Sequence, residues 1–516
     1  MIVRSTFPDV EIPDVSVPAY VLRNAGQYPE RQALVDGLSG DQLSYGQLAA
    51  YVDRVAAALV ERGVRPGDTV AIFSPNTIYY PVVFHGIAAA GALSSTINSL
   101  YTPDEIAFQL KDSQAKVLIT VSPFLDRAKA AAEKAPLAEI IVLDGAKGHA
   151  SLRDLLSSQA PSPQVEINAA EDLVTLPYSS GTTGLAKGVM LTHRNLVANC
   201  AQCEPLFAVG EGERFIAVLP FFHIYGLTVL MNVGLANGAT VVTMPRFDLE
   251  QFLMILQDQK ITRAYVAPPI VLALAKHPLV DQYDLSSLQV VFSGAAPLDA
   301  ELADACAARL GCDVKQGYGM TELSPVSHSM PDGTPMPSGS VGVNLPNTES
   351  RLVSVESGED AAEGEPGELW VRGPQVMKGY LNNDEATAAT LDADGWLHTG
   401  DVAALRDGVF YIVDRVKELI KYKGYQVAPA ELEAILLGHP KIADAAVIGV
   451  PDEEGGEIPK AFVVTAPGQE LSADEVMDYI AGIVAPHKKV RAVEFIETVP
   501  KSASGKILRK DLRGKT

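Results

Sequence analysis

The sequence predicts an α/β protein with a large N-terminal domain of several subdomains and a small α+β C-terminal domain. Three observations predict this fold class. Helical and strand patterns alternate through the first two-thirds of the 516 residues. Shorter alternating segments then indicate a β-rich region, and helices and strands return near the C-terminus. A chain of this length is also too long for one hydrophobic core.

The first two-thirds of the chain read as mixed α/β layers. Residues 45–63 have apolar side chains at three- and four-residue spacing and stop at Gly63, which predicts a helix. The same spacing over 299–311 predicts another, ending at Gly311. Short β-branched runs bounded by turn residues predict buried strands. These runs lie at 115–122, 140–145, 239–245 and 288–297.

The pattern changes twice in the last third. From about 341 to 413, short segments such as GELWVRG and GVFYIVD are separated by glycines, which favours antiparallel strands. Beyond them, PAELEAILL places Pro429 in the first turn of a helix. The strands DAAVIGV and KAFVVTA follow, in a unit of about a hundred residues that is large enough to be a domain. We therefore expect domains at 1–414 and 415–516, with a hinge near 414–417.

Composition indicates a globular protein. Apolar residues make up 47% of the chain and charged residues 20%. No apolar run reaches the roughly 18 residues that span a bilayer. The N-terminus meets acidic residues and prolines before a signal-like stretch can form. We expect a cytoplasmic protein without a membrane span.

The cysteines do not indicate a metal or redox site. Cys200, Cys203, Cys306 and Cys312 do not fit a secreted disulfide scaffold in so long a chain. The C-x-x-C at 200–203 lies in a helical pattern without a second spaced pair, which favours buried thiols.

The formal net charge of −22 argues against a nucleic-acid or anionic-membrane partner. The charge is unevenly placed. From Lys417 onward, 14 basic and 15 acidic residues nearly balance, with basic clusters KELIKYKG, PHKKVR and KILRK. Each cluster is either a solvated face or a contact for a polyanionic small molecule.

Residues 178–195, YSSGTTGLAKGVMLTHRN, combine glycines and hydroxyl side chains with a lysine. Glycine lets backbone N–H groups approach a phosphate closely, so the loop indicates a nucleotide. It departs from the Walker pattern, because Gly184 is followed by Leu-Ala-Lys-Gly. Alone, it is either a phosphate loop or an ordinary glycine-rich turn.

Four further motifs decide between these alternatives. They are GYGMTE at 317–322, WLHTGD at 396–401, VDRVKELIKYKGYQ at 413–426 and PKSASGK at 500–506. In this order and spacing, the sequence resembles the adenylate-forming superfamily of acyl-CoA synthetases, firefly luciferases and nonribosomal adenylation domains over nearly the whole chain. The resemblance implies an enzyme that joins a carboxylic acid to AMP from ATP, and then transfers the acyl group to coenzyme A.

The resemblance also implies how ATP is bound. The implied nucleotide-binding residues are Ser179, Ser180, Gly181, Thr182, Thr183, Gly184, Lys187, Ala295, Gln316, Gly317, Tyr318, Thr321, Asp401 and Arg415. In the resembled enzymes Glu322 would hold Mg²⁺, for which a carboxylate oxygen is a natural ligand. One departure is Ala186, where the family usually has proline. We expect a modest effect on nucleotide affinity.

The same family uses its small, mobile domain in both half-reactions. Lys506 resembles the lysine that bridges the acyl carboxylate and the α-phosphate during adenylation. Lys417 resembles the hinge residue about which the small domain then rotates. The positions implied for thioester formation are Lys421 and Gln426, with Lys423 and Gly424 near the thiol arm of coenzyme A.

The stretch LPFFHIYGL at 219–227 resembles 4-coumarate–CoA ligases more closely than luciferases. There His223 would lie by the acyl carboxylate, although a core histidine is the alternative. The implied acyl pocket is Ile224, Tyr225, Val229, Phe292, Ala295, Gly317, Gly319, Pro325 and Val326. Its small residues leave a flat slot, and Tyr225 offers a phenolic partner for a ring hydroxyl. These features favour phenylpropanoid acids of the 4-coumarate or cinnamate type.

Two other functions stay open. A medium- or long-chain fatty acyl-CoA ligase would share every motif except the pocket. A non-catalytic adenylate-binding protein is disfavoured, because the charged residues of the implied site are all present. These residues are Lys187, Glu322, Asp401, Arg415 and Lys506.

Overall fold

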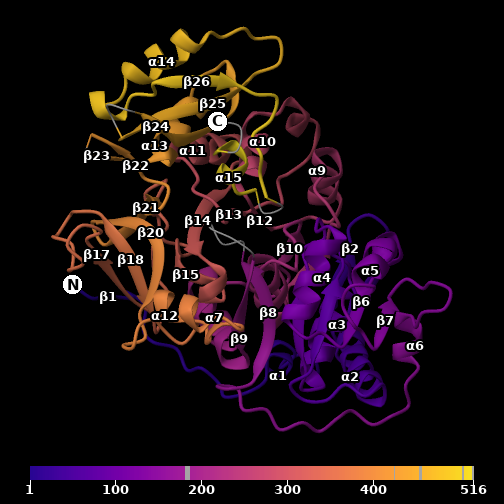
Figure 1. The fold of residues 1–516 in the computed structure, drawn as a ribbon. Coiled ribbons are helices and arrows are strands. Elements are labelled where there is room, and N and C mark those ends of the chain that lie inside the picture. Colours follow the sequence, from indigo (N-terminus) through magenta and orange to yellow (C-terminus); the bar gives the residue numbers. More distant parts are fainter. Residues whose placement is uncertain (180–185, 424, 453–455, 503–504, 514–516) are drawn as a thin grey trace.

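The computed structural model describes residues 1–179, 186–423, 425–452, 456–502 and 505–513. Four β-sheets organise these residues (Figure 1). Two large sheets and a five-stranded sheet lie in the part before residue 416, and the fourth lies in the small C-terminal part, orange to yellow in Figure 1. This is the α/β class that the sequence predicts, with a large N-terminal and a small C-terminal part.

The seven-stranded sheet has the order β19-β9-β8-β5-β4-β6-β7. Its strands are β4 (Thr69–Phe73), β5 (Leu93–Thr96), β6 (Val117–Thr120), β7 (Glu139–Val142), β8 (Leu173–Ser179), β9 (Lys187–Thr192) and β19 (Gly379–Tyr380). The strands from β8 to β7 in this order are parallel, whereas β9 pairs antiparallel with both β8 and β19. The helices of this region are α2 (Tyr45–Glu61), α3 (Tyr80–Ala89), α4 (Pro103–Asp112), α5 (Leu125–Ala132) and α6 (Leu152–Leu156).

The nine-stranded sheet has the order β16-β15-β14-β13-β12-β10-β11-β2-β3. Its strands are β2 (Gln32–Asp36), β3 (Gln42–Ser44), β10 (Arg214–Ala217), β11 (Thr240–Thr243), β12 (Arg263–Val266), β13 (Val290–Ser293), β14 (Asp313–Gly319), β15 (Val326–Ser329) and β16 (Val343–Asn344). The accompanying helices are α1 (Val17–Val21), α7 (His193–Phe207), α8 (Gly234–Ala236), α9 (Leu249–Asp258), α10 (Pro268–Lys276) and α11 (Ala300–Leu310).

The register of this sheet brings distant residues to one edge. Val266 of β12 pairs with Ser293 of β13, which pairs with Gln316 of β14. Because these strands are parallel, the segments after them emerge side by side, as in open α/β sheets whose ligands bind beyond the carboxyl ends of the strands. The short helix η4 (Thr321–Leu323) follows β14 at this edge.

The two remaining sheets are smaller. The antiparallel β-rich region contains β1 (Val3–Arg4), β17 (Glu349–Val353), β18 (Gly367–Arg372), β20 (Leu397–Arg406) and β21 (Val409–Arg415), with α12 (Asp384–Thr390) nearby in sequence. The C-terminal part contains β22 (Ile420–Tyr422), β23 (Tyr425–Val427), β24 (Ile442–Asp452), β25 (Gly456–Thr465), β26 (Ala492–Phe495), α13 (Pro429–Leu437), α14 (Ala473–Ala481) and α15 (Arg509–Arg513).

Most helices begin where the sequence supplies a cap. Ser44 and Gln47 form a reciprocal capping box at the start of α2, and Thr102 and Glu105 do the same at α4. Gly311 ends α11 in the left-handed conformation, at φ +67°. The predicted helices over 45–63 and 299–311 are therefore confirmed within two residues at each end.

The small C-terminal part has a hydrophobic core of its own, which includes Ile420, Leu432, Val447 and Ile480. No helix of the described residues is long and apolar enough to cross a bilayer. The division at 414–417 stays a prediction, and the contacts at this point join the two parts closely.

Asp414 makes a polar contact across this junction. Asp414 lies in β21, which is paired with β20, yet its Oδ2 accepts a hydrogen bond from the backbone N–H of Ala430 in α13, at 2.9 Å. The N-cap residue Ala428 gives α13 no side-chain cap. A helix N-terminus leaves N–H groups without partners and favours negative charge. A carboxylate before the junction thus caps a helix after it.

A π-helix, η2 (Gly226–Val233), follows β10 and lies wholly in the core. Its first residue is constrained by a close approach, because a Cβ at Gly226 would lie 2.1 Å from the carbonyl oxygen of Pro220. Only glycine fits against the backbone there.

Gly226→Ala is expected to destabilise the protein by about 1–3 kcal/mol or more, since overpacking against a fixed carbonyl forces the backbone apart. The matched control is Gly210→Ala, where a new Cβ meets nothing within 4 Å. Urea unfolding followed by circular dichroism measures both. Equal midpoints for the two variants would contradict the contact.

Candidate active site

Asp401 joins two sheets at the centre of the site. Its Oδ2 accepts a hydrogen bond of 2.6 Å from the hydroxyl of Tyr318 in β14, and its Oδ1 lies 3.3 Å from Nε of Arg415. Asp401 and Arg415 are direct partners in the β20–β21 ladder. Burial and the Asp401 charge raise the pKa of Tyr318, so its hydroxyl stays a donor. The structure therefore places three of the predicted nucleotide residues together.

Glu322 forms a second group with the seven-stranded sheet. Glu322 is buried, and its Oε1 accepts from the hydroxyl of Tyr380 at 2.7 Å and from Oγ of Ser179 at 3.3 Å. Ser179 pairs with Lys187 in the β8–β9 ladder. Nζ of Lys187 lies 4.3 Å from the centre of the Tyr380 ring. Both ends of the glycine-rich loop thus lie near Glu322.

The middle of that loop contains five of the predicted nucleotide-binding residues. Ser180, Gly181, Thr182, Thr183 and Gly184 lie outside the described residues, as does Gly424. Thr321 begins η4, directly before Glu322.

Lys506 comes from the small C-terminal part and lies in the same site. Its backbone N–H donates to Oγ of Ser502 at 3.2 Å, which shapes the turn before it. A Cβ at Gly505, whose φ is +83°, would lie 3.1 Å from Cβ of Ala267 after β12, so the turn touches the large part. Burial, and after it the Arg415 charge, lower the pKa of Lys506 to about 8, although Asp401 and Glu322 act to raise it.

His223 lies near Lys506 as a neutral side chain. Burial, and then the Lys506 charge, lower its pKa to about 4, so the imidazole is neutral at physiological pH. The backbone N–H of Tyr225 donates to Nδ1 of His223 at 3.3 Å. Because a neutral imidazole has one donor and one acceptor, this bond assigns the proton to Nε2.

The loop after β13 is held by Gln316. The Leu298 N–H donates to Oε1 of Gln316 at 3.2 Å, and Nε2 donates back to the Leu298 carbonyl at 3.3 Å. Within this loop Ala295 has φ +71°, a left-handed conformation that is uncommon for alanine. Such backbone strain is concentrated at functional sites.

The predicted acyl-pocket residues line the core beside this loop. Tyr225 donates its hydroxyl to the Phe292 carbonyl at 3.3 Å, and its ring packs on Gly294, where a Cβ would lie 2.7 Å from the ring. Ile224 and Val229 are at most 1% exposed, whereas Tyr225, Phe292 and Val326 keep 6–8%. Ala295 and Gly319 of the same predicted set are exposed to solvent.

Close backbone contacts, which the sequence analysis did not predict, explain the glycines at positions 317 and 319. A Cβ at Gly317 would lie 2.8 Å from the His328 carbonyl oxygen, and one at Gly319 would lie 2.3 Å from that of Pro325. The neighbouring backbone alone therefore requires glycine at both positions.

The residues predicted for the second half-reaction lie elsewhere. Lys421 and Gln426 pair with each other across β22 and β23, and both are exposed to solvent. Lys423 and Lys417 belong to the same segment of the small part, and Figure 1 shows β22 and β23 at its edge. The described arrangement thus brings Lys506, and not this segment, among the site carboxylates.

Sequence analysis also missed Tyr380. It contacts both Lys187 and Glu322. Its only sequence signal is a Gly-Tyr pair at 379–380, which is unremarkable without the fold.

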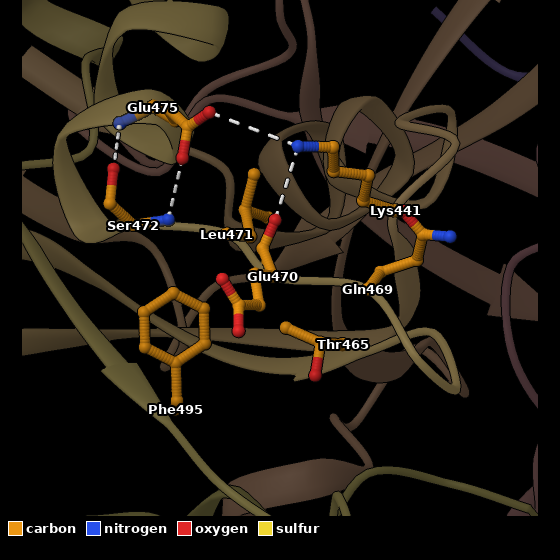
Figure 2. Close-up of a pocket in the computed structure, with 8 residues that line it drawn as sticks. All are labelled: Lys441, Thr465, Gln469, Glu470, Leu471, Ser472, Glu475 and Phe495. Atoms are coloured by element: carbon orange, nitrogen blue, oxygen red, sulfur yellow. Dashed lines mark hydrogen bonds and ion pairs between the residues drawn. The ribbon is translucent and has the colours of Figure 1, made fainter.

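An open hollow of about 710 Å³ lies on the small part, away from these residues (Figure 2). Several of its polar groups bond to one another. Ser472 and Glu475 form the capping box of α14, and Nζ of Lys441 donates to the Glu470 carbonyl at 3.1 Å. We therefore place the functional site at the Lys506 group.

Known proteins are similar to this chain over nearly its whole length. Residues 21–381 match the AMP-binding enzyme family, and residues 431–506 match the AMP-binding enzyme C-terminal domain. The chain is 44% identical to 4-coumarate–CoA ligase 5 of Oryza sativa subsp. japonica, over 99% of this chain and 97% of that one. It is 43% identical to 4-coumarate–CoA ligase 2 of Nicotiana tabacum, over 100% and 97%.

Solved structures with a similar fold include the anthranilate CoA ligase AuaEII in complex with anthranoyl-AMP, with a TM-score of 0.91 and 28% identity over 98% of both chains. ATP-bound MatB from Rhodopseudomonas palustris has a TM-score of 0.89 and 29% identity, over 98% of this chain and 99% of that one.

The lowered pKa of Lys506 leads to a direct test. Its amine should react with acetic anhydride at a rate that reaches half its maximum near pH 8, because only the neutral amine is nucleophilic. N-acetyl-lysine amide, with a pKa of about 10.4, is the reference. Competitive labelling with mass spectrometry measures both rates. A Lys506 midpoint above pH 10 would contradict its burial in the site.

Proposed function

The chain belongs to the AMP-binding enzyme family, and from this premise we infer that it is an ATP-dependent, AMP-forming acid–CoA ligase acting on aromatic acids. The observation that carries the inference is the position of Lys506, which the small part inserts beside Asp401, Glu322 and His223 of the large part. The finer proposal is that the acid is of the 4-coumarate or cinnamate type, as the names of the relatives indicate.

The reaction needs activation because a carboxylate is anionic and has no leaving group. In the first half-reaction a carboxylate oxygen attacks the α-phosphorus of ATP, the bond to the bridging oxygen breaks, and pyrophosphate leaves. In the second, the sulfur of coenzyme A attacks the acyl carbonyl and AMP leaves. Negative charge in these transition states is stabilised by preorganised cations and N–H groups.

The nucleotide would lie along the edge where the sheets meet. We propose that the glycine-rich loop and Lys187 hold the β- and γ-phosphates, and Thr321 the α-phosphate. Asp401 would accept from the ribose hydroxyls, since a carboxylate offers about four acceptor sites and its two bonds to Tyr318 and Arg415 leave capacity. Adenine would lie against Ala295 and the 316–318 strand end.

Glu322 fits a role in holding Mg²⁺. Its Oε1 is fixed by Tyr380 and Ser179. Among the described residues no three His, Cys, Asp or Glu side chains form a metal cage. Mg²⁺ is commonly bound by one or two carboxylates together with substrate phosphates. When bound, the ion would neutralise phosphate charge.

Lys506 would stabilise the charge that develops between the two substrates. In the free enzyme burial holds its pKa near 8. An acyl carboxylate and an α-phosphate raise the pKa of a neighbouring amine, so both substrates would favour the ammonium. His223, with its proton on Nε2, would donate to the acyl carboxylate without adding a second buried charge.

The acid would occupy the slot beside Phe292 and Val326. Tyr225 already donates its proton to the Phe292 carbonyl, so its oxygen would accept a hydrogen bond from a ring hydroxyl. This geometry supports a 4-hydroxylated ring whose hydroxyl is the donor.

Coenzyme A would arrive after a domain rotation at Lys417. In that second arrangement Lys421 and Gln426 would replace Lys506 at the adenylate, with Lys423 and Gly424 near the thiol arm. Their exposure in the described arrangement is consistent with this order of events. We also propose a cytoplasmic location, supported by four free cysteines.

Acid-dependent ATP–pyrophosphate exchange tests the proposed function. 4-Coumarate, ferulate and cinnamate should support faster exchange than benzoate or decanoate. A preference for decanoate would assign the chain to fatty acids, and no exchange with any acid would contradict the ligase.

Lys506→Ala should block the exchange yet leave transfer from a supplied coumaroyl adenylate to coenzyme A largely intact, because only adenylation needs its charge. Gln426→Ala should show the opposite pattern: it should lose acyl transfer to coenzyme A and keep ATP–pyrophosphate exchange. Single-turnover measurements of each half-reaction separate the two. Equal losses in both half-reactions for either variant would contradict its assigned step.

A further inference from the structure

We propose that Tyr380 is a positioning residue for adenylation, whose ring holds Lys187 and whose hydroxyl orients Glu322. The proposal rests on the proposed function, because it assigns the polyphosphate to Lys187 and the divalent cation to Glu322. It adds a third residue that fixes both groups relative to each other.

The backbone around Tyr380 is fixed from two directions. Tyr380 pairs with Val189 in the β19–β9 ladder, and the Leu381 N–H donates to the Gly188 carbonyl at 2.8 Å. The Tyr380 N–H itself donates to Oγ1 of Thr387 at 2.9 Å. The side chain is buried. Since β9 begins at Lys187, the strand that carries the lysine also positions the tyrosine.

The hydroxyl bonds to a charged oxygen. It donates to Oε1 of Glu322 at 2.7 Å, closer than the 3.3 Å bond from Ser179 to the same atom. Hydrogen bonds to an ionised carboxylate are shorter and stronger than neutral ones. Glu322 therefore has one oxygen held in place.

The ring contacts the opposite charge. Nζ of Lys187 lies 4.3 Å from the ring centre, within the range of a cation–π interaction. A neutral ring holds the ammonium without cancelling its charge, so the lysine stays free to exchange onto a phosphate. One side chain thus contacts the cation with its face and the carboxylate with its hydroxyl. A direct ion pair between Lys187 and Glu322 would instead occupy both groups.

The two functions of Tyr380 can be separated by substitution. Tyr380→Phe keeps the ring and removes the hydroxyl, whereas Tyr380→Leu removes both and keeps an apolar side chain. The probes are ATP with Mg²⁺ and ATP with EDTA, titrated into the full chain by calorimetry without acid or coenzyme A. Tyr28→Phe is the matched control, because the Tyr28 ring also holds a cation, Arg31 at 4.1 Å, outside the site.

Tyr380→Phe should weaken binding of ATP with Mg²⁺ by about threefold to tenfold, the factor that corresponds to one hydrogen bond. Binding of ATP with EDTA should change by less than about twofold, because the ring still holds Lys187. Tyr380→Leu should weaken the binding of both forms of ATP, whereas the control Tyr28→Phe should weaken neither.

Three results would overturn the proposal. Tyr380→Phe could bind both forms of ATP as the wild type does, or could weaken both equally, or Tyr380→Leu could leave metal-free ATP unaffected. If Tyr380→Leu does not fold, the Tyr380→Phe ratio decides alone. A wild type that binds no ATP would contradict the proposed function itself, whereas normal wild-type binding with unaltered variants contradicts only the role of Tyr380.

Discussion

The hydrogen bond from Tyr318 to Asp401, at 2.6 Å, joins the end of the nine-stranded sheet to the β20–β21 hairpin, and the rest of the site depends on this contact. Three residues after Tyr318, the chain enters η4, which places Glu322 against Ser179 of the seven-stranded sheet. Three sheets thus meet within a few residues of β14. The small C-terminal part, which contains the fourth sheet, supplies Lys506, and the other three sheets bring together the carboxylates that surround it.

Burial determines how the site is charged. Removing water lowers the pKa of His223 to about 4 and that of Lys506 to about 8. Lys506 is the group whose charge can change, because its pKa reflects opposing effects. Burial and Arg415 lower this pKa, whereas Asp401 and Glu322 raise it. An anionic substrate would raise the pKa of Lys506 further, as the two carboxylates do. The protein therefore places a titratable amine where the arrival of its substrates favours the charged form.

The sequence predicts the elements and the motif residues well, because both depend on local chemistry. Helix 45–63 follows from apolar spacing, and the family resemblance that the motifs carry points to Lys187, Glu322 and Lys506. What it cannot predict are contacts between distant segments. The pairing of β19 with β9 places Tyr380 at the site, and nothing near residue 380 indicates this partner.

The reason for a glycine at a given position is also hard to predict from sequence. Gly317 and Gly319 suggested room for a substrate, whereas the structure shows that carbonyl oxygens of His328 and Pro325 leave no space for a Cβ. A sequence shows where a glycine stands. Only the structure shows the neighbouring backbone atoms that leave no room for a side chain there. The sequence likewise predicts a phenolic partner at Tyr225, but only the structure shows that its hydroxyl donates to the Phe292 carbonyl.

The cap that Asp414 provides for α13 has a consequence for anyone who exchanges small domains between related chains. A graft whose seam lies at Lys417 would separate the helix start at Ala430 from its carboxylate. The recipient would then have to supply an equivalent acid at the end of its own β-hairpin. A seam placed before β21 would carry the cap along, but it would also carry Arg415 and cut the β20–β21 ladder. The two parts of this molecule thus have separate hydrophobic cores, but Asp414 contributes to both: it lies in the β20–β21 hairpin and caps α13.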